Sequence, residues 1–199
     1  IGPMIGRCPM SPPPAKSKLA RSGLFYDKQI LGPMQSIARA NAPKTISTQF
    51  GKVTLTPKQI IDIDILARSV YGEMGGCLDK NRNYGLAVAK VVLNRTKLVD
   101  SGAGKGKLFT QPRHEKLHHP SKSTIAKVLT DPKQFSIWNR EQANDPSDLN
   151  ILRVMCPSRD KSTYNWKNKE PNEKIILEIY WYIIINELEN KYFCDPNEI

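Results

Sequence analysis

The chain has 199 residues, of which 39% are hydrophobic, so it is long enough to form one domain with a sizeable core. Its 30 Lys and Arg residues outnumber 19 Asp and Glu residues and give a net charge of +11, which predicts attraction to polyanions such as nucleic acid or a bacterial cell wall. No apolar run approaches the roughly 20 residues of a membrane-spanning helix, and the absence of zinc-finger, RNA-recognition and phosphate-loop signatures disfavours nucleic acid as the partner.

Residues 1–50 are rich in Pro, Gly and Lys, and this composition predicts a partly extended flank. Seven prolines interrupt this stretch, and it shows no sustained apolar period. Within it, residues 17–26 predict a short helix, and residues 45–55 predict a short strand or an extended arm. We therefore place the folded domain at residues 51–199.

The first strong helix signal begins at Thr56. Thr56 is a favourable N-cap, Pro57 suits the first helical position, and Gln59 follows the cap by three residues, as in a capping box. The glycine pair at residues 75–76 predicts the end of this helix.

Glu73 lies in the last turn of that predicted helix, on a face otherwise occupied by apolar side chains. This stripe consists of Ile63, Leu66, Ala67 and Val70. A carboxyl that continues the stripe is expected to face the interior, where desolvation raises its pKa and keeps it protonated, as a general acid requires. The carbonyl end of the helix favours the same protonated form. The alternative is a helix-end Glu that reaches solvent or pairs with a nearby Arg.

Further helices are predicted along the rest of the chain. A segment at residues 84–98, capped by Asn83, contains the runs 86–89 and 91–93, which are apolar on nearly all sides, and it is expected to be the central buried helix. A Gly- and Lys-rich insertion at 99–122 separates it from shorter helices at 123–130 and 145–155. A long helix is expected at 171–190, with a core stripe of Ile175, Ile176, Ile179, Tyr180, Ile183 and Ile184. The pattern predicts a mainly α fold.

Three segments occur in an order that resembles the SleB/CwlJ family of bacterial cell-wall hydrolases. They read Leu-Ala-Arg-Ser-Val-Tyr-Gly-Glu at 66–73, Gly-Leu-Ala-Val-Ala-Lys-Val-Val-Leu-Asn-Arg at 85–95, and Val-Leu-Thr-Asp-Pro-Lys-Gln-Phe-Ser-Ile-Trp at 128–138. The resemblance covers roughly residues 60–140. It implies a compact, mainly α, lysozyme-like domain, here preceded by the Pro-rich N-terminal flank.

The resemblance also implies an activity. Family members cleave the glycan strand of peptidoglycan between N-acetylmuramic acid and N-acetylglucosamine, outside the cytoplasm, and their essential Glu corresponds to Glu73. No cofactor or metal is implied, and we expect a monomer. The implied substrate-binding residues are Tyr71, Tyr84, Gln134, Phe135, Ser136 and Trp138. For Phe135 and Trp138, ordinary core packing is an equally good interpretation, and for Asn94 and Arg95 we expect structural hydrogen bonds at a helix end.

The chain departs from the family pattern beyond Glu73. Family members commonly carry a second Glu four residues later, where this chain has Cys77, and Asp79 follows in a longer loop. Without a partner carboxylate at fixed spacing, we expect a lytic transglycosylase that forms 1,6-anhydro products. A hydrolytic muramidase, or lysozyme, is the alternative if Asp79 or Asp131 faces Glu73 across the groove.

Two other functions are compatible with the sequence. His114-Glu115-Lys116-Leu117-His118 matches the H-E-x-x-H pattern of zinc peptidases, but Pro112 and Pro120 leave at most about two turns of helix around it. A solvated loop explains this segment more simply. The second alternative is a non-catalytic module that binds polyanions through its basic surface.

Overall fold

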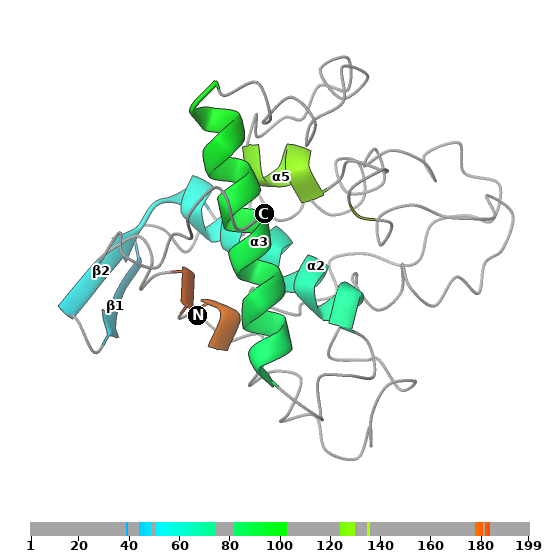
Figure 1. Ribbon diagram of the computed structural model, residues 1–199. Coiled ribbons are helices and arrows are strands. Elements are labelled where there is room, and N and C mark those ends of the chain that lie inside the picture. Colours follow the sequence, from blue (N-terminus) through cyan, green and yellow to red (C-terminus); the bar gives the residue numbers. More distant parts are fainter. Residues whose placement is uncertain are drawn as a thin grey trace, which may run out of the picture.

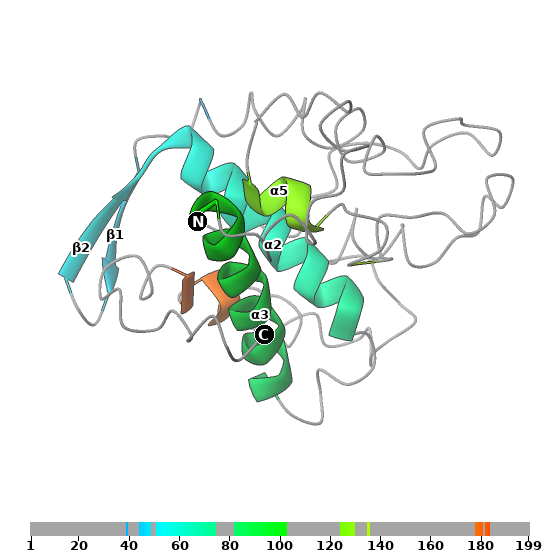
Figure 2. The same cartoon turned by 45° about the horizontal axis from the view of Figure 1, so that its top comes forward.

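A computed structural model defines the fold. It describes residues 39, 44–48, 51–74, 82–102, 124–129, 135, 178–180 and 182–183. This part of the chain is mainly helical. Three helices and a β-hairpin account for most of it (Figures 1 and 2). Two predicted helices, at 17–26 and 145–155, lie outside the described residues.

The hairpin consists of strands β1, Lys44–Thr48, and β2, Gly51–Leu55, which pair antiparallel. Thr48 lies opposite Gly51 in this register, and Gly51 has a φ of 129°, a conformation that L side chains rarely adopt. The predicted strand at 45–55 is therefore two strands. The predicted boundary between flank and domain, at residue 50, falls between these two paired strands.

Helix α2 spans Pro57–Met74 and begins with the predicted capping box. The Thr56 backbone N–H donates to Gln59 Oε1 at 2.8 Å, and the Gln59 backbone N–H donates to Thr56 Oγ1 at 3.2 Å. These reciprocal bonds satisfy two donors that a helix N-terminus otherwise leaves without partners. The cap also fixes the direction in which β2 enters α2, because Leu55 is buried immediately before it.

Helix α2 is the central helix of the described structure. Every residue from Ile63 to Tyr71 is buried, and α2 packs against both α3, Arg82–Asp100, and α5, Thr124–Leu129. The prediction that the helix at 84–98 occupies this central place is wrong. Helix α3 exposes Ala87, Lys90 and Lys97, so it lies against the core with one side in solvent.

The described ends of the insertion after α3 are joined by a side-chain hydrogen bond. Helix α3 ends in a turn at Gly102, whose φ of 71° and backbone N–H bond to Val99 O close the helix. Thr124 Oγ1, at the start of α5, donates to Asp100 Oδ1 at 2.6 Å. This bond brings the beginning of α5 to the end of α3, which agrees with the packing of these two helices.

The described residues near the C-terminus support the predicted core stripe. Residues 178–180 and 182–183 are helical, and Ile179, Tyr180 and Ile183 are buried. The bounds of the predicted helix at 171–190 lie partly outside the described residues. Among the described helices, none is both long and apolar enough to cross a membrane.

Candidate active site

Glu73 lies in the last turn of α2, but its side chain is exposed. The prediction that it faces the interior is wrong, although Val70, three residues earlier, is fully buried. The C-terminal end of α2 extends beyond α5 (Figures 1 and 2). The stripe is buried as far as Val70, and the side chain of Glu73, one turn later, lies at the surface.

Exposure does not leave Glu73 with an ordinary acidity. Partial burial desolvates the carboxylate and raises the pKa of Glu73 above its usual 4.5. Within the described residues, no Lys or Arg forms an ion pair with it. The exposed side chain agrees with the alternative of a helix-end Glu that reaches solvent, whereas pairing with a nearby Arg has no support in this part of the chain. A partly desolvated carboxyl at an accessible helix end is suited to donating a proton.

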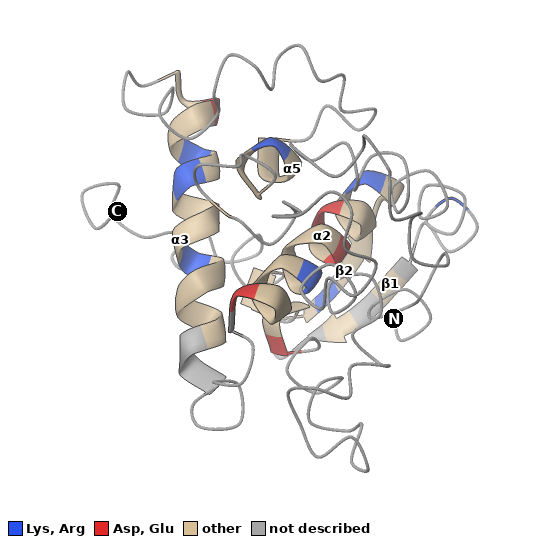
Figure 3. Ribbon diagram, turned by 90° about the vertical axis from the view of Figure 1, so that its right-hand side faces the viewer, with Lys and Arg blue, Asp and Glu red and all other residues tan. Residues whose placement is uncertain are grey.

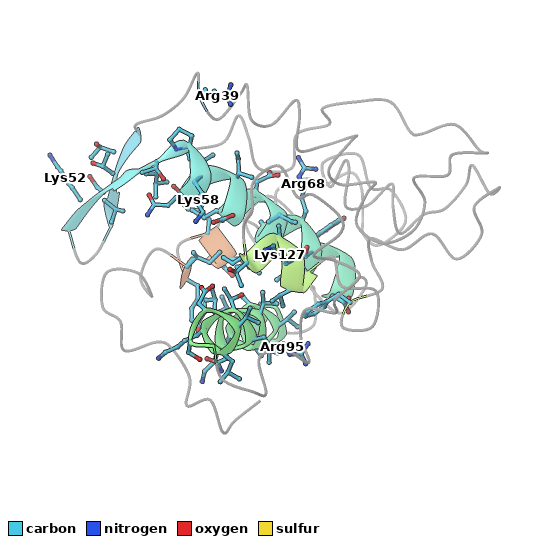
Figure 4. All side chains as sticks on the ribbon, turned by 90° about the horizontal axis from the view of Figure 1, so that it is seen from above. Arg39, Lys52, Lys58, Arg68, Arg95 and Lys127 are labelled. Carbon is cyan, nitrogen blue, oxygen red and sulfur yellow. The ribbon has the colours of Figure 1, made fainter. Side chains whose placement is uncertain are left out.

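A buried ion pair lies further back on α2. Arg68 Nε donates to Asp64 Oδ2 at 2.9 Å, and both side chains are only 1% exposed. Desolvation raises the pKa of Asp64, while the adjacent guanidinium opposes that rise. Figure 4 shows Arg68 extending from α2 on the side away from α3. The second oxygen, Asp64 Oδ1, is buried and accepts no hydrogen bond from any described residue.

Asp62 and Asp64 do not supply a second catalytic carboxylate. They precede Glu73 by eleven and nine residues on one continuous helix, which separates them from it by about 13 Å or more along the axis. The two carboxyls of standard glycosidases lie roughly 5–9.5 Å apart. Asp64 is also engaged by Arg68. The other candidates, Asp79 and Asp131, lie outside the described residues.

Residues of all three sequence segments that carry the resemblance lie on helices that pack against one another, namely α2, α3 and α5. Arg95, on α3, places its Cζ atom 5.3 Å from the centre of the Phe135 ring, and Phe135 is only 7% exposed. This arrangement is a cation–π contact. Partial burial also lowers the pKa of Arg95 from its usual value. Phe135 thus packs in the interior, as in the core-packing interpretation, instead of presenting its ring on an open surface.

Asn94 and Arg95 do not occupy a helix end. Both lie inside α3, five or more residues before its end at Asp100. Asn94 is buried, and its Oδ1 atom accepts no hydrogen bond from the described part of the chain. The predicted position at a helix end is therefore wrong for this pair, because α3 continues for an additional turn beyond them.

The structure bears differently on Tyr71 and Tyr84, which were both expected to bind substrate. Tyr71 is fully buried, which is the position of a core residue, so we leave it out of the proposed site. Tyr84 lies in the first turns of α3, and the structure describes only its backbone. Several predicted residues lie outside the described residues, namely Gln134, Ser136, Trp138 and the possible zinc ligands His114 and His118. The described residues contain no cluster of side chains able to hold a metal ion.

Charge is distributed differently on the two long helices. Figure 3 shows acidic and basic positions interspersed on α2, whereas the acidic position on α3 is at its C-terminal end. Lys90, Arg95 and Lys97 precede that residue, Asp100. Two contacts, Asp64–Arg68 and Arg95–Phe135, were missed by the sequence analysis. The four-residue spacing of Asp64 and Arg68 is a signal that would have identified the first.

Comparison with protein-family models, with curated proteins and with solved structures found no match to this chain. The resemblance to cell-wall hydrolases therefore rests on the residues of the three segments.

Proposed function

We propose that the protein cleaves the glycan strand of peptidoglycan between N-acetylmuramic acid and N-acetylglucosamine, with Glu73 as the general acid. The observation that carries this proposal is the environment of Glu73. Its carboxyl has a raised pKa from desolvation, and it is accessible at the end of a helix whose preceding residues are buried. Protonation of a glycosidic oxygen requires such a group.

The scaffold around Glu73 suits a catalytic side chain. A proton donor needs a fixed position, and α2 is held by its capping box at one end and by α3 and α5 along its length. The following glycines, Gly75 and Gly76, allow a ligand to approach the backbone closely. The net charge of +11 would attract the protein to the anionic cell wall. Because that substrate lies outside the cytoplasm, the proposed activity takes place there.

The mechanism we propose is that of a lytic transglycosylase. Glu73 first donates its proton to the glycosidic oxygen as the bond to the muramic acid anomeric carbon breaks. The resulting carboxylate then accepts the proton of the muramic acid 6-hydroxyl, whose oxygen attacks that carbon and closes a 1,6-anhydro ring. One carboxyl is sufficient for both steps, in agreement with the distance of Asp62 and Asp64 from Glu73 along α2.

The test is the activity of Glu73→Gln on purified peptidoglycan, followed by the clearing of turbidity. The substitution keeps size and hydrogen bonding but removes the acid, so we expect activity to fall about 10²- to 10⁴-fold. The matched control is Asp62→Asn, which removes an equal charge from the same helix and should leave activity near that of the wild type. An active Glu73→Gln variant would refute the assignment.

A non-catalytic role makes different predictions. A module that only binds polyanions would bind peptidoglycan without clearing it, and Glu73→Gln would bind equally well. A zinc peptidase would release peptides and lose activity in the presence of a chelator. Either result would replace glycan cleavage as the function.

A further inference from the structure

The β1–β2 hairpin presents a polar face to solvent. Thr45 lies opposite Thr54, with the two hydroxyl oxygens 2.9 Å apart, and Ser47 lies opposite Lys52. Alternate residues of a strand point to the same face, and so do residues directly opposite each other, so these four side chains share one face. All four are exposed. Leu55 points to the other face and is buried, which orients the hairpin relative to the core.

The groups on this polar face are suited to a ligand rich in negatively charged oxygen atoms. The Lys52 ammonium has three donors and no acceptor. In the bond between Thr45 and Thr54, one hydroxyl proton is shared between the two oxygens, which leaves the other proton for a partner outside the protein. Ser47 adds a further hydroxyl, and the face carries no carboxylate. An anionic ligand therefore complements it in charge and in hydrogen bonding.

The cations at this end of the described structure have no acidic partners there. Lys52 and Lys58, in the first turn of α2, are exposed, and within the described residues neither forms an ion pair. No Asp or Glu occurs in residues 28–61. Figure 4 shows Lys52 on the hairpin and Lys58 near the beginning of α2. In contrast to the buried Arg68, which Asp64 neutralises, these two charges remain available to an anion in solution.

This surface is separate from the candidate catalytic carboxyl. Residues 58 and 73 are 15 positions apart on one continuous helix, which places Lys58 about 22 Å from Glu73 along the axis. The hairpin precedes α2 and projects from its N-terminal end, away from the end that carries Glu73 (Figures 1 and 2). A ligand on the hairpin therefore leaves Glu73 accessible, and a long polymer can reach both.

We propose that the polar face of the hairpin, together with Lys58, binds carboxylate groups of peptidoglycan as a second contact with the polymer that Glu73 cleaves. This inference rests on the proposed function. An ammonium forms charge-assisted hydrogen bonds with a carboxylate, but each such contact at an exposed site is weak and is screened by salt. A polymer with repeated carboxylates compensates, because one bound group holds the others at a high effective concentration.

The test is cosedimentation with purified, insoluble peptidoglycan in the Glu73→Gln background, which prevents cleavage during the measurement. Lys52→Gln/Lys58→Gln should raise Kd about tenfold at low salt, and the difference should shrink as salt is added. The matched control is Lys90→Gln/Lys97→Gln, which removes the same charge from exposed positions of α3. It should change Kd less than about twofold. Equal weakening by both pairs would show that net charge alone attracts the wall, and would overturn the proposal.

A second pair of variants tests the face without removing a lysine. Ser47→Glu places a carboxylate opposite Lys52, where it neutralises the ammonium and repels an anionic ligand. It should weaken binding about as much as the lysine double variant. Ala87→Glu makes the same change of charge at an exposed position of α3 and should leave binding near that of the parent protein. Unchanged binding by Ser47→Glu would overturn the proposal.

Two further measurements separate this surface from the catalytic site and from nucleic acid. In the active enzyme, Lys52→Gln/Lys58→Gln should raise KM on insoluble peptidoglycan but leave kcat/KM on short, uncharged glycan fragments unchanged. If the double variant lost affinity for duplex DNA but not for peptidoglycan, the hairpin would be a nucleic-acid surface and the proposal would be wrong. A wild-type protein that binds the wall through the hairpin without cleaving it would overturn only the proposed function.

Discussion

Glu73 combines two properties that are usually opposed, an exposed side chain and a raised pKa. The stripe spacing identified the residue, but it placed the carboxyl in the interior, because periodicity alone does not show which positions of a stripe the rest of the fold covers. The acidity was expected for the correct physical reason, which is desolvation. What the local sequence could not supply is the exposure, since that depends on α3 and α5.

The raised pKa of Glu73 predicts a pH dependence of activity. A general acid works only while protonated, so kcat/KM should fall as the pH rises through the pKa of Glu73. The midpoint of that basic limb should lie above 4.5, the ordinary value. A profile of kcat/KM against pH on soluble glycan strands measures it. A limb centred at or below 4.5 would contradict a desolvated proton donor.

The raised pKa of Glu73 also predicts that the stability of the fold depends on pH, which can be measured without substrate. A carboxyl with a folded-state pKa above its unfolded value stabilises the fold below the unfolded pKa, and this contribution disappears as the pH rises through the folded pKa. Glu73→Gln resembles the protonated form at every pH. Its melting temperature should therefore match that of the wild type below pH 4.5, exceed it as the pH rises through the folded-state pKa, and keep a constant excess above that pKa. A difference between the two proteins that stayed constant over the whole pH range would indicate that the pKa is not raised.

At the scale of the element, α2 carries an ion pair in the centre of the fold. The segment at 84–98 was expected to be central because its runs 86–89 and 91–93 are apolar on nearly all sides. Helix α2 can be buried nevertheless, because Asp64 and Arg68, four residues apart, neutralise each other within the helix. The start of α2 was predicted correctly, since a capping box depends only on residues three positions apart.

Removing one member of the Asp64–Arg68 pair should lower the free energy of unfolding far more than removing both. Asp64→Leu leaves a buried guanidinium without its carboxylate, which should lower the free energy of unfolding by about 3–5 kcal/mol. The double variant Asp64→Leu/Arg68→Met leaves no buried charge at this position. It should recover most of that loss, because apolar replacements of buried ion pairs are often neutral or stabilising.

Urea denaturation of the wild type, Asp64→Leu, Arg68→Met and the double variant gives the coupling free energy between the two side chains. Lys90→Met serves as the control for loss of a cation at an exposed helical position and should change stability by less than about 0.5 kcal/mol. Independent, additive effects of the two substitutions would show that Arg68 is stabilised mainly by groups other than Asp64.

At the scale of the whole molecule, local signals predicted the elements better than their arrangement. The helix beginning at Thr56, the short helix α5 and the buried residues Ile179 and Ile183 follow from patterns within a few positions. The contact between Arg95 and Phe135 has no such pattern, because its partners are 40 residues apart.

The reaction type is the last prediction, and it depends on the arrangement of carboxylates in the molecule as a whole. Glu73 has no partner carboxylate within α2 at a distance that suits standard glycosidases, because Asp62 and Asp64 are about 13 Å or more away along the axis. Attack by the 6-hydroxyl of muramic acid needs no second carboxylate to orient water. We therefore expect the released muropeptides to carry 1,6-anhydro ends.

Mass spectrometry of digested peptidoglycan distinguishes the two reactions, because an anhydro end is lighter than a reducing end by one water. Asp79→Asn and Asp131→Asn are the informative variants, since these residues would activate water in a muramidase. Both should retain activity and produce the same anhydro ends as the wild type. Predominantly reducing muramic acid ends, together with loss of activity in either variant, would identify a hydrolase in which that aspartate lies across the groove from Glu73.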